Sequence, residues 1–239
     1  MLGGALAVAA PAAAQKYPVR PIRLVVPSSP GGGSDILGRI LAQKLTELLG
    51  QQVVVDNRPG ASTSIAAAAV AKSPADGYTL LLTTKSQMVN NQYLYKKLAF
   101  DPLNDFSHIT MIAYSGHVLV VHPAVPARTV KELVALGRRK PGTLTYGSSG
   151  VGATPHLAAE LFRSMTGVDM LHVPYKSGVT AMTDLAAGRV DLYFGLIGGI
   201  TSSLIEARRV RAVAVTGLAR HALHPDLPTM VESGLAGYE

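Results

Sequence analysis

Two glycine-rich turns contain the residues of this chain that are best suited to bind an anion. The first is 27–35 and the second is 147–155. Each follows an apolar strand and precedes an amphipathic helix, so backbone N–H groups at the helix start point outward. Glycine lets a ligand approach this backbone, and the helix dipole favours negative charge there. Two such turns, more than a hundred residues apart, predict two lobes that share one anionic ligand. The alternative is that both are ordinary tight turns between a strand and a helix.

Polar side chains gather where the predicted strands end, and in open α/β sheets ligands bind beyond the carboxyl ends of the strands. Hydroxyl and N–H groups with one lysine can hold an anion without transforming it. For Tyr175 and Lys176 a plain surface pair is the alternative, and His156 is expected to cap or line the second turn. The candidate ligand-binding residues at these strand ends are Ser28, Ser29, Gly31, Gly32, Ser34, Asp35, Thr83, Thr84, Ser86, Ser148, Ser149, Gly150, Thr154, His156, Tyr175 and Lys176.

The usual catalytic patterns are absent from the sequence. There is no Gly-x-Ser-x-Gly elbow, no serine three residues before a lysine and no P-loop, and the glycines of the second turn do not follow the dinucleotide-binding order. The seven histidines are dispersed without neighbouring carboxylates, which argues against a metal site. No cysteine is present, which excludes disulfides, thiolate zinc sites, iron–sulfur clusters and a thiol nucleophile. We therefore expect a protein that is not an enzyme and has no cofactor or metal.

The charge balance favours small acids over nucleic acid as partners. The 239 residues include 22 Lys and Arg against 15 Asp and Glu, a formal charge of +7. The basic residues are scattered and are not interleaved with aromatic side chains, so nucleic-acid binding is not expected. A positive surface suits the capture of small anions.

The N-terminal residues 1–14 are apolar and small, and Ala12 with Ala14 fits the pattern for cleavage before Gln15. The segment is too short for a membrane-spanning helix. We interpret it as the remnant of an export signal, and a disordered alanine-rich tail is the alternative. The expected location is the periplasm, as a soluble protein.

From Tyr17 onward, strands alternate with helices, which predicts an α/β fold with mostly parallel sheets flanked by helices. Thr154 is predicted to cap the helix that contains Pro155. Thr129 and Thr229, each followed by glutamate three residues later, predict capping boxes. The expected strands are 21–26, 52–55, 78–82, 108–113, 116–122, 143–146, 169–173, 190–194 and 211–216. The expected helices are 35–49, 63–72, 87–95, 129–139, 154–166, 178–187, 200–207 and 229–233.

Region 101–128 breaks the alternation, because two apolar runs follow one another with only four residues between them. An extended segment of this kind can carry the chain from one lobe to another. We place the first lobe at 17–113 and the second at 114–239.

Motifs spread over 17–239 resemble the Bug-type receptors, the periplasmic substrate-binding proteins of tripartite tricarboxylate transporters. Each motif alone is weak, but the combination is highly specific. The motifs are Tyr17–Pro18 with Pro21–Ile22–Arg23; Val26–Pro27 with Pro30–Gly31–Gly32–Gly33 and Asp35; Val55 with Asn57–Arg58–Pro59–Gly60–Ala61; Asp76–Gly77–Tyr78–Thr79–Leu80–Leu81; Leu94–Tyr95–Lys96–Lys97–Leu98; Asp101–Pro102 with Asp105–Phe106; Lys140–Pro141–Gly142; His172–Val173–Pro174–Tyr175–Lys176; and Leu227–Pro228–Thr229.

The resemblance implies a two-lobed periplasmic binding protein of the Venus-flytrap, type II-like architecture. It implies capture of a small carboxylate or related metabolite and its delivery to membrane permease subunits. It also places the ligand among 28–35, 83–86, 148–156, 175–178 and the loop after Phe194, which adds Gly195 to the candidate residues.

The sequence departs from the family pattern at several positions. Ser28 and Ser29 stand where the family usually has an aromatic residue, and 62–64 replace a frequent Gly-Gly-Asn. Gly195 replaces a common aspartate that could hold an ammonium group, which favours plain acids over amino acids as ligands.

The family continues beyond Glu239 with a strand that returns to the first lobe and with further helices. We therefore expect a C-terminally incomplete receptor that is marginally stable or depends on a partner chain. Full-length family members are expected to be monomers, and this chain is expected to self-associate.

Three classes of function remain open. The favoured class is a transport receptor. A sensor that presents its bound state to a signalling partner has the same sequence features. An enzyme on the same scaffold is less favoured, because the sequence shows no paired nucleophile and base.

Overall fold

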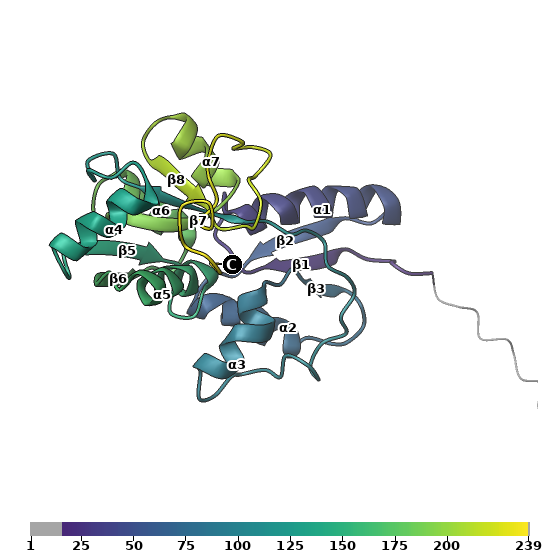
Figure 1. Cartoon of the computed structure of the whole chain (residues 1–239). Coiled ribbons are helices and arrows are strands. Elements are labelled where there is room, and N and C mark those ends of the chain that lie inside the picture. The colour runs from purple at the N-terminus through teal and green to yellow at the C-terminus, as the bar shows by residue number, and fades with distance from the viewer. Residues whose placement is uncertain (1–15, 239) are drawn as a thin grey trace, which may run out of the picture.

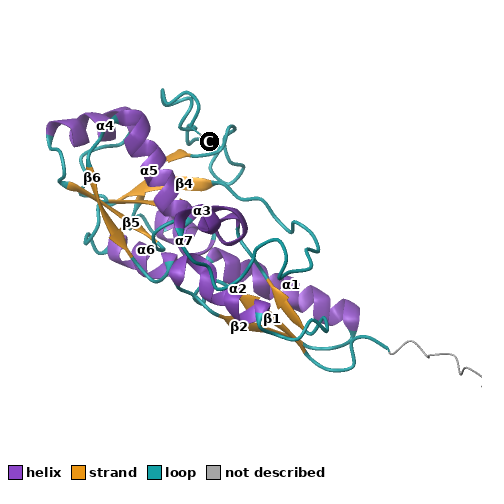
Figure 2. Cartoon of the chain, turned by 90° about the horizontal axis from the view of Figure 1, so that it is seen from below, coloured by secondary structure: helices purple, strands orange, loops and turns teal. Residues whose placement is uncertain are grey.

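The computed structural model describes residues 16–238. The predicted signal peptide and the cleavage site before Gln15 lie outside this part. Within it, the strands form two sheets in two lobes, and helices pack on the sheets (Figures 1 and 2). The predicted α/β architecture with parallel-rich sheets is confirmed.

The first sheet is parallel throughout and has the order β2-β1-β3 in the described residues. Its apolar strands meet α1 in a small core that includes Ile22, Leu24, Val26, Ala42 and Val53. Continuous apolar strands of this kind need cover on both faces. The elements are β1 (Ile22–Val26), α1 (Gly33–Leu49), β2 (Val53–Asn57), α2 (Ser64–Ala71), β3 (Thr79–Leu81), a π-helical turn (Ser86–Asn90) and α3 (Asn91–Leu94).

The second sheet has the order β6-β5-β7-β4-β8, and β4 alone runs antiparallel to its neighbours. Separate apolar clusters cover its two faces, one around Phe162 and Phe194 and one around Met182 and Tyr193. The elements are β4 (His117–Val121), α4 (Val130–Arg139), β5 (Leu144–Ser148), α5 (Thr154–Thr166), β6 (Met170–Pro174), α6 (Gly178–Ala186), β7 (Leu192–Leu196), α7 (Gly199–Glu206) and β8 (Arg211–Val215).

Two sequence predictions of regular structure are wrong. The segment 108–113 forms no strand, because no strand lies beside it in the described residues to accept its hydrogen bonds. The segment 229–233 is a turn, not a helix. Its capping-box bonds do form, since the Thr229 amide donates to Glu232 at 2.8 Å and the Glu232 amide donates to Thr229 Oγ1 at 2.9 Å. Gly234 and Gly237, at φ 98° and 82°, then turn the chain away from a helical path.

The connection between the lobes, residues 107–116, runs without regular secondary structure along the molecule (Figure 1). The proposed lobe boundary at 113/114 falls within it and stays a prediction.

Candidate functional site

Helices α1 and α5, which follow the two glycine-rich turns, begin without a side-chain cap. Their N-cap residues are Gly32 and Ala153, and neither accepts a side-chain hydrogen bond from the helix. Thr129 caps α4 and Ser177 caps α6 through their hydroxyl groups, whereas α2, α3 and α7 also begin without a side-chain cap. The N–H groups of a helix's first turn have no acceptor within the helix itself, so helix starts are places where an anion can be bound. The predicted cap at Thr154 is therefore wrong, because Ala153 occupies that place and α5 already begins at Thr154.

The first turn is closed from inside by the Asp35 carboxylate. Asp35 is only 2% exposed, and it accepts hydrogen bonds from the Gly31 amide and Asn57 Nδ2, both at 2.9 Å, and from Arg39 Nε at 3.0 Å. Burial alone would raise the pKa of Asp35, but the bonds from Arg39, Gly31 and Asn57 outweigh it and lower the pKa. The structure therefore places Asp35 behind the turn, as a support for its backbone.

In the second turn, Gly150 and Gly152 adopt φ angles of 118° and 85°, which glycine reaches without strain. Two of its amides are used internally. The Gly150 amide donates to Ser148 Oγ at 3.1 Å, and the Gly152 amide donates to His156 Nδ1 at 3.2 Å. The predicted role of His156 as a residue that caps this turn agrees with this contact.

Behind the second turn lies an aromatic stack of Tyr146, His172 and His156. The ring centroids of Tyr146 and His172 are 4.8 Å apart, and those of the two histidines are 4.4 Å apart. Tyr146 hydrogen-bonds Glu160, which pairs with Arg163 at 2.9 Å. Burial and then the neighbouring His156 lower the pKa of His172 to about 4, and burial also lowers the pKa of His156. Both imidazoles are therefore neutral at pH 7.

A serine and a histidine meet in this cluster, although no sequence motif indicates such a pair. Ser148 Oγ lies 2.6 Å from His172 Nε2. Ser148 is fully buried, and its hydroxyl also donates to the Gly150 carbonyl at 3.2 Å. A nucleophile must reach its substrate, whereas this hydroxyl is enclosed by the turn that it supports. The pair therefore fits a structural role.

Each glycine-rich turn meets a different segment of the opposite lobe. A Cβ added to Gly33 would lie 2.3 Å from Leu196 Cδ2, and one added to Gly199 would lie 3.2 Å from the Gly31 carbonyl oxygen. The first turn therefore lies against the end of β7 and the start of α7. The approach is this close because glycine occupies both sides of the boundary.

The second turn lies against the segment 60–63 and α3 of the first lobe. Tyr95 OH donates to the Val151 carbonyl at 2.8 Å, and Ser62 Oγ donates to the same carbonyl. A Cβ on Gly152 would lie 2.7 Å from Leu94 Cδ1. The lobes thus touch at both turns.

The remaining candidate ligand-binding residues differ in their hydrogen-bond partners and in their exposure. Thr83 Oγ1 donates to Gln87 Oε1 at 2.8 Å, and Tyr175 OH donates to Asp184 at 2.9 Å. Lys176 is exposed. Gly195 is buried against α7, where an added Cβ would lie 2.8 Å from Thr201 Oγ1. Ser86 opens the π-helical turn, and its side chain lies outside the described part of the structure.

Three buried polar atoms close to the boundary have no hydrogen-bond partner among the described residues. They are Ser28 Oγ in the first turn, Thr84 Oγ1 after β3, and Asn91 Oδ1 on α3. An unpaired buried polar group is costly, so each of these atoms would be stabilised by a hydrogen-bond partner.

The candidate residues predicted from the sequence do not include four polar residues that join the two lobes or hold the segment that does: Ser62, Gln87, Asn91 and Tyr95. A signal was present, because Gln87, Asn91 and Tyr95 are spaced by four residues and so share one face of a helix. For Ser62 no sequence pattern predicts the contact.

The described residues contain no group of three or more His, Asp or Glu placed to hold a metal ion. No helix of residues 16–238 has the length and apolar character that crossing a bilayer requires.

Residues 37–239 match the model of the tripartite tricarboxylate transporter family receptor. The chain belongs to this family. The chain is 41% identical over 226 residues to a Pseudomonas sp. (strain P51) protein known as the "UPF0065 protein in tcbD-tcbE intergenic region", covering 93% of this chain and 66% of that relative. The resemblance to Bug-type receptors and the periplasmic binding-protein fold are thereby confirmed.

Two solved receptors share the fold over 93% of this chain. An R. palustris protein solved with adipate is 41% identical, with a TM-score of 0.91 and 74% of its length covered. MatC from Rhodopseudomonas palustris, solved with bound malate, is 26% identical, with a TM-score of 0.87 and 76% covered. The chain spans 66% and 65% of the length of two curated family relatives.

Proposed function

We propose that this chain is an extracytoplasmic solute receptor that binds a small organic acid between its lobes and delivers it to a tripartite tricarboxylate transporter permease. The observation that carries the proposal is the pair of uncapped helices, α1 and α5, whose first turns lie at the lobe boundary. Amides at such helix starts are donors for a carboxylate.

The available donors are sufficient for useful affinity. Each charge-assisted hydrogen bond to a carboxylate contributes about 1.5–3 kcal/mol, and each helix start adds about 0.3–1 kcal/mol. Micromolar binding requires about 8 kcal/mol, so a few such contacts acting together are enough. The unpaired buried hydroxyl groups of Ser28 and Thr84 are further partners for the ligand.

The proposed ligand is a plain dicarboxylate. Receptors of this fold have been solved with adipate and with malate, which are both dicarboxylic acids. At Gly195 the adjacent Thr201 fills the space of a side chain, so no acidic group stands there to hold an ammonium ion. The proposed contacts come from Ser28, Ser29, Gly31, Gly32, Ser34, Thr83, Thr84, Ser86, Ser149, Gly150, Thr154, Tyr175 and Lys176, with Asp35, Ser148, His156 and Gly195 supporting the backbone around them.

The proposed location is the periplasm, and the proposed membrane partners are the permease subunits that the family description implies. A sensor that uses the same site would bind the same acids, so transport needs its own test. Uptake of a labelled acid by cells with the permease should require this chain.

The direct test is calorimetry with adipate, malate and the amino acid aspartate. We expect saturable binding of at least one plain dicarboxylate and weaker binding of aspartate. Mass spectrometry of molecules that remain bound during native purification provides an independent readout. Retention of a neutral or cationic molecule, with no binding of any carboxylate, would contradict the proposal.

A further inference from the structure

The segment that faces the second glycine-rich turn has a strained backbone. Gly60, Ala61, Ser62 and Thr63 have consecutive positive φ angles of 114°, 46°, 48° and 74°. Residues with a side chain rarely adopt this region, and the β-branched Thr63 is a genuine outlier. Such conformations persist only where the surrounding contacts fix them, and they concentrate at functional sites.

Two fully buried amide side chains fix this strained segment. Asn91 Nδ2 donates to the Ser62 carbonyl at 3.0 Å, and Gln87 Nε2 donates to the Thr63 carbonyl at 2.5 Å. Asn91 Nδ2 also donates to Ser64 Oγ at 2.8 Å. The first lobe therefore holds residues 62–64 in one conformation from behind.

The strained conformation places the Ser62 side chain across the lobe boundary. Ser62 is 2% exposed, and its hydroxyl donates to the Val151 carbonyl. Tyr95 OH donates to the same carbonyl at 2.8 Å and lies 3.2 Å from Ser62 Oγ. Val151 stands between the two left-handed glycines of the second turn. Two hydroxyl groups of one lobe thus converge on one carbonyl of the other.

We propose that Ser62 and Tyr95 are positioning residues that latch the two lobes together before ligand arrives. By holding the Val151 carbonyl they keep the second turn against the first lobe. That this turn binds the ligand rests on the proposed function. The ligand-free chain is then mostly closed. Because apparent affinity is the intrinsic affinity multiplied by the closed, binding-competent fraction, the latch tightens ligand binding without touching the ligand.

A purely structural role makes a different prediction. If the two hydroxyl groups only stabilised the first lobe, their removal would lower the melting temperature and leave the distance between the lobes unchanged. The experiment therefore measures that distance directly in the ligand-free chain.

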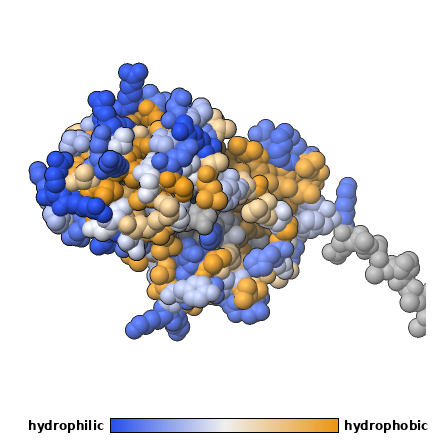
Figure 3. Space-filling model, viewed as in Figure 1, coloured by the Kyte–Doolittle hydropathy of each residue, from blue (hydrophilic) through white to orange (hydrophobic). Residues whose placement is uncertain are grey.

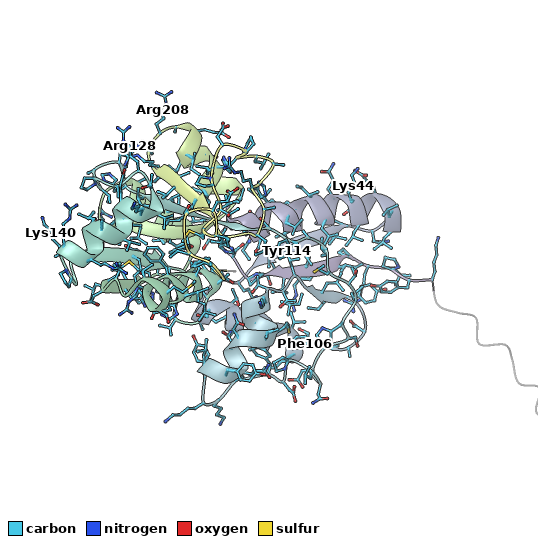
Figure 4. All side chains as sticks on the ribbon, viewed as in Figure 1. Lys44, Phe106, Tyr114, Arg128, Lys140 and Arg208 are labelled. Carbon is cyan, nitrogen blue, oxygen red and sulfur yellow. The ribbon has the colours of Figure 1, made fainter. Side chains whose placement is uncertain are left out.

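The chain has no cysteine, so Lys44→Cys on α1 and Lys140→Cys after α4 provide two unique labelling sites. Both lysines point away from the molecule at opposite ends (Figure 4). Distances between spin labels at these positions are compared in four backgrounds: the parent chain, Ser62→Gly, Tyr95→Phe and the control Tyr93→Phe. Tyr93 is 81% exposed and lies two residues from Tyr95, so its variant removes the same hydroxyl group outside the latch.

We expect an additional population of distances between the two spin labels in Ser62→Gly and Tyr95→Phe. In Tyr93→Phe we expect the same distance distribution as in the parent chain. Ser62→Gly keeps the fold testable, because glycine accepts the φ angle of 48° without strain. Unchanged distributions in both latch variants, or an equal change in Tyr93→Phe, would overturn the proposal.

Binding of adipate, the probe ligand, provides the second measurement. We expect at least about fivefold weaker affinity in Ser62→Gly and Tyr95→Phe, within the usual range of coupling between a conformational equilibrium and binding. If the parent chain binds no carboxylate, the proposed ligand class fails while the distance measurement still decides the latch. If binding is intact and the distances do not change, the latch fails and the proposed function stands.

Discussion

The Asp35 carboxylate supports the first glycine-rich turn from within the first lobe. It joins the Gly31 amide, the Asn57 side chain and Arg39 in one buried set of hydrogen bonds. The sequence predicted Asp35 at the turn, but it could not show that the carboxylate points inward. That orientation depends on Asn57, which β2 brings to the turn from 22 residues away.

Asp35→Ala should destabilise the chain by roughly 2–4 kcal/mol, because it leaves buried hydrogen-bond donors unpaired. The lost ion pair with the exposed Arg39 contributes only a small part of this loss. Glu47→Ala is the matched control, since Glu47 pairs with Lys44 on the exposed face of the same helix and should contribute less than about 1 kcal/mol. Urea denaturation of both variants measures the difference. Equal losses would show that the Asp35 contacts do not stabilise the turn.

The stacked histidines predict an acid-sensitive second turn. The folded pKa of His172 is about 4, below the value of about 6.5 for histidine in an unfolded chain. The unfolded chain therefore binds a proton that the folded chain does not, so stability is full above about pH 6.5 and falls as the pH drops toward 4. Burial also lowers the pKa of His117 to about 4, so several histidines contribute to this loss.

Between about pH 7 and pH 5, the melting temperature of His172→Gln should fall less than that of the parent chain, because the variant lacks one of the histidines with a lowered pKa. His108→Gln is the control, since His108 is exposed. Melting curves across this pH range test the prediction. An unchanged pH slope in His172→Gln would mean that the histidine stack does not carry the acid sensitivity.

Among the helices, α1 and α5, which follow the glycine-rich turns, differ from α4 and α6 at the N-terminus, and they share the missing side-chain cap with α2, α3 and α7. Thr129 and Ser177 cap α4 and α6, whereas α1 and α5 begin after Gly32 and Ala153 without a side-chain cap. A missing cap costs about 1 kcal/mol of stability. Both helix starts lie at the lobe boundary, where the proposed ligand would accept hydrogen bonds.

Ala153→Ser should therefore stabilise the ligand-free chain by about 0.5–1 kcal/mol and weaken carboxylate binding, because the new hydroxyl competes for the same amides. Thr129→Ala, which removes a cap far from the boundary, should destabilise by about 1 kcal/mol and leave binding unchanged. Denaturation and calorimetry on both variants separate the two effects. Stronger binding by Ala153→Ser would contradict the proposed use of the helix start.

Most of the elements could be predicted from local sequence, because their signals are local. The bounds of α5 are those predicted, since Pro155 marks its first turn and Gly167 adopts the left-handed conformation that ends it. The prediction of a strand at 108–113 is wrong for a different reason. Its apolar pattern fits a strand, but a strand also needs a neighbour, and sequence alone does not show whether one is present.

The site was predictable only in part for a similar reason. Glycine-rich turns after strands are visible in the sequence, whereas the contacts that join the lobes depend on tertiary structure. Ser62 reaches Val151 across 89 residues of sequence, and it does so through a left-handed backbone that a serine rarely adopts. Propensity predicts the opposite conformation at this position.

At the scale of the whole molecule, the connection between the lobes exposes apolar side chains. Ile109, Met111 and Tyr114 are 79%, 81% and 86% exposed. Tyr114 lies on the strand-free connection in Figure 4, and Figure 3 shows further apolar surface over the first lobe. Contiguous exposed apolar surface favours association.

We therefore predict that the chain binds a fluorescent hydrophobic dye and that its elution volume depends on concentration. Ile109→Lys with Met111→Lys should reduce both effects. Leu218→Lys with Leu223→Lys, two exposed leucines of the C-terminal region, is the control and should change them less. A monodisperse parent chain that does not bind the dye would show that this surface does not drive association.

In the proposed complex, the second glycine-rich turn holds the carboxylate of the ligand. Ser149 lies in this turn and is half-buried, whereas Ser203 is exposed on α7. The decisive measurement is calorimetry of Ser149→Asp and Ser203→Asp with a dicarboxylate that the parent chain binds, after both variants are shown to melt cooperatively. Ser149→Asp places a like charge beside the carboxylate and should weaken binding by roughly a hundredfold or more, whereas Ser203→Asp should leave it unchanged. Equal affinities in the two variants would contradict the account, because the second turn would then not be part of the site.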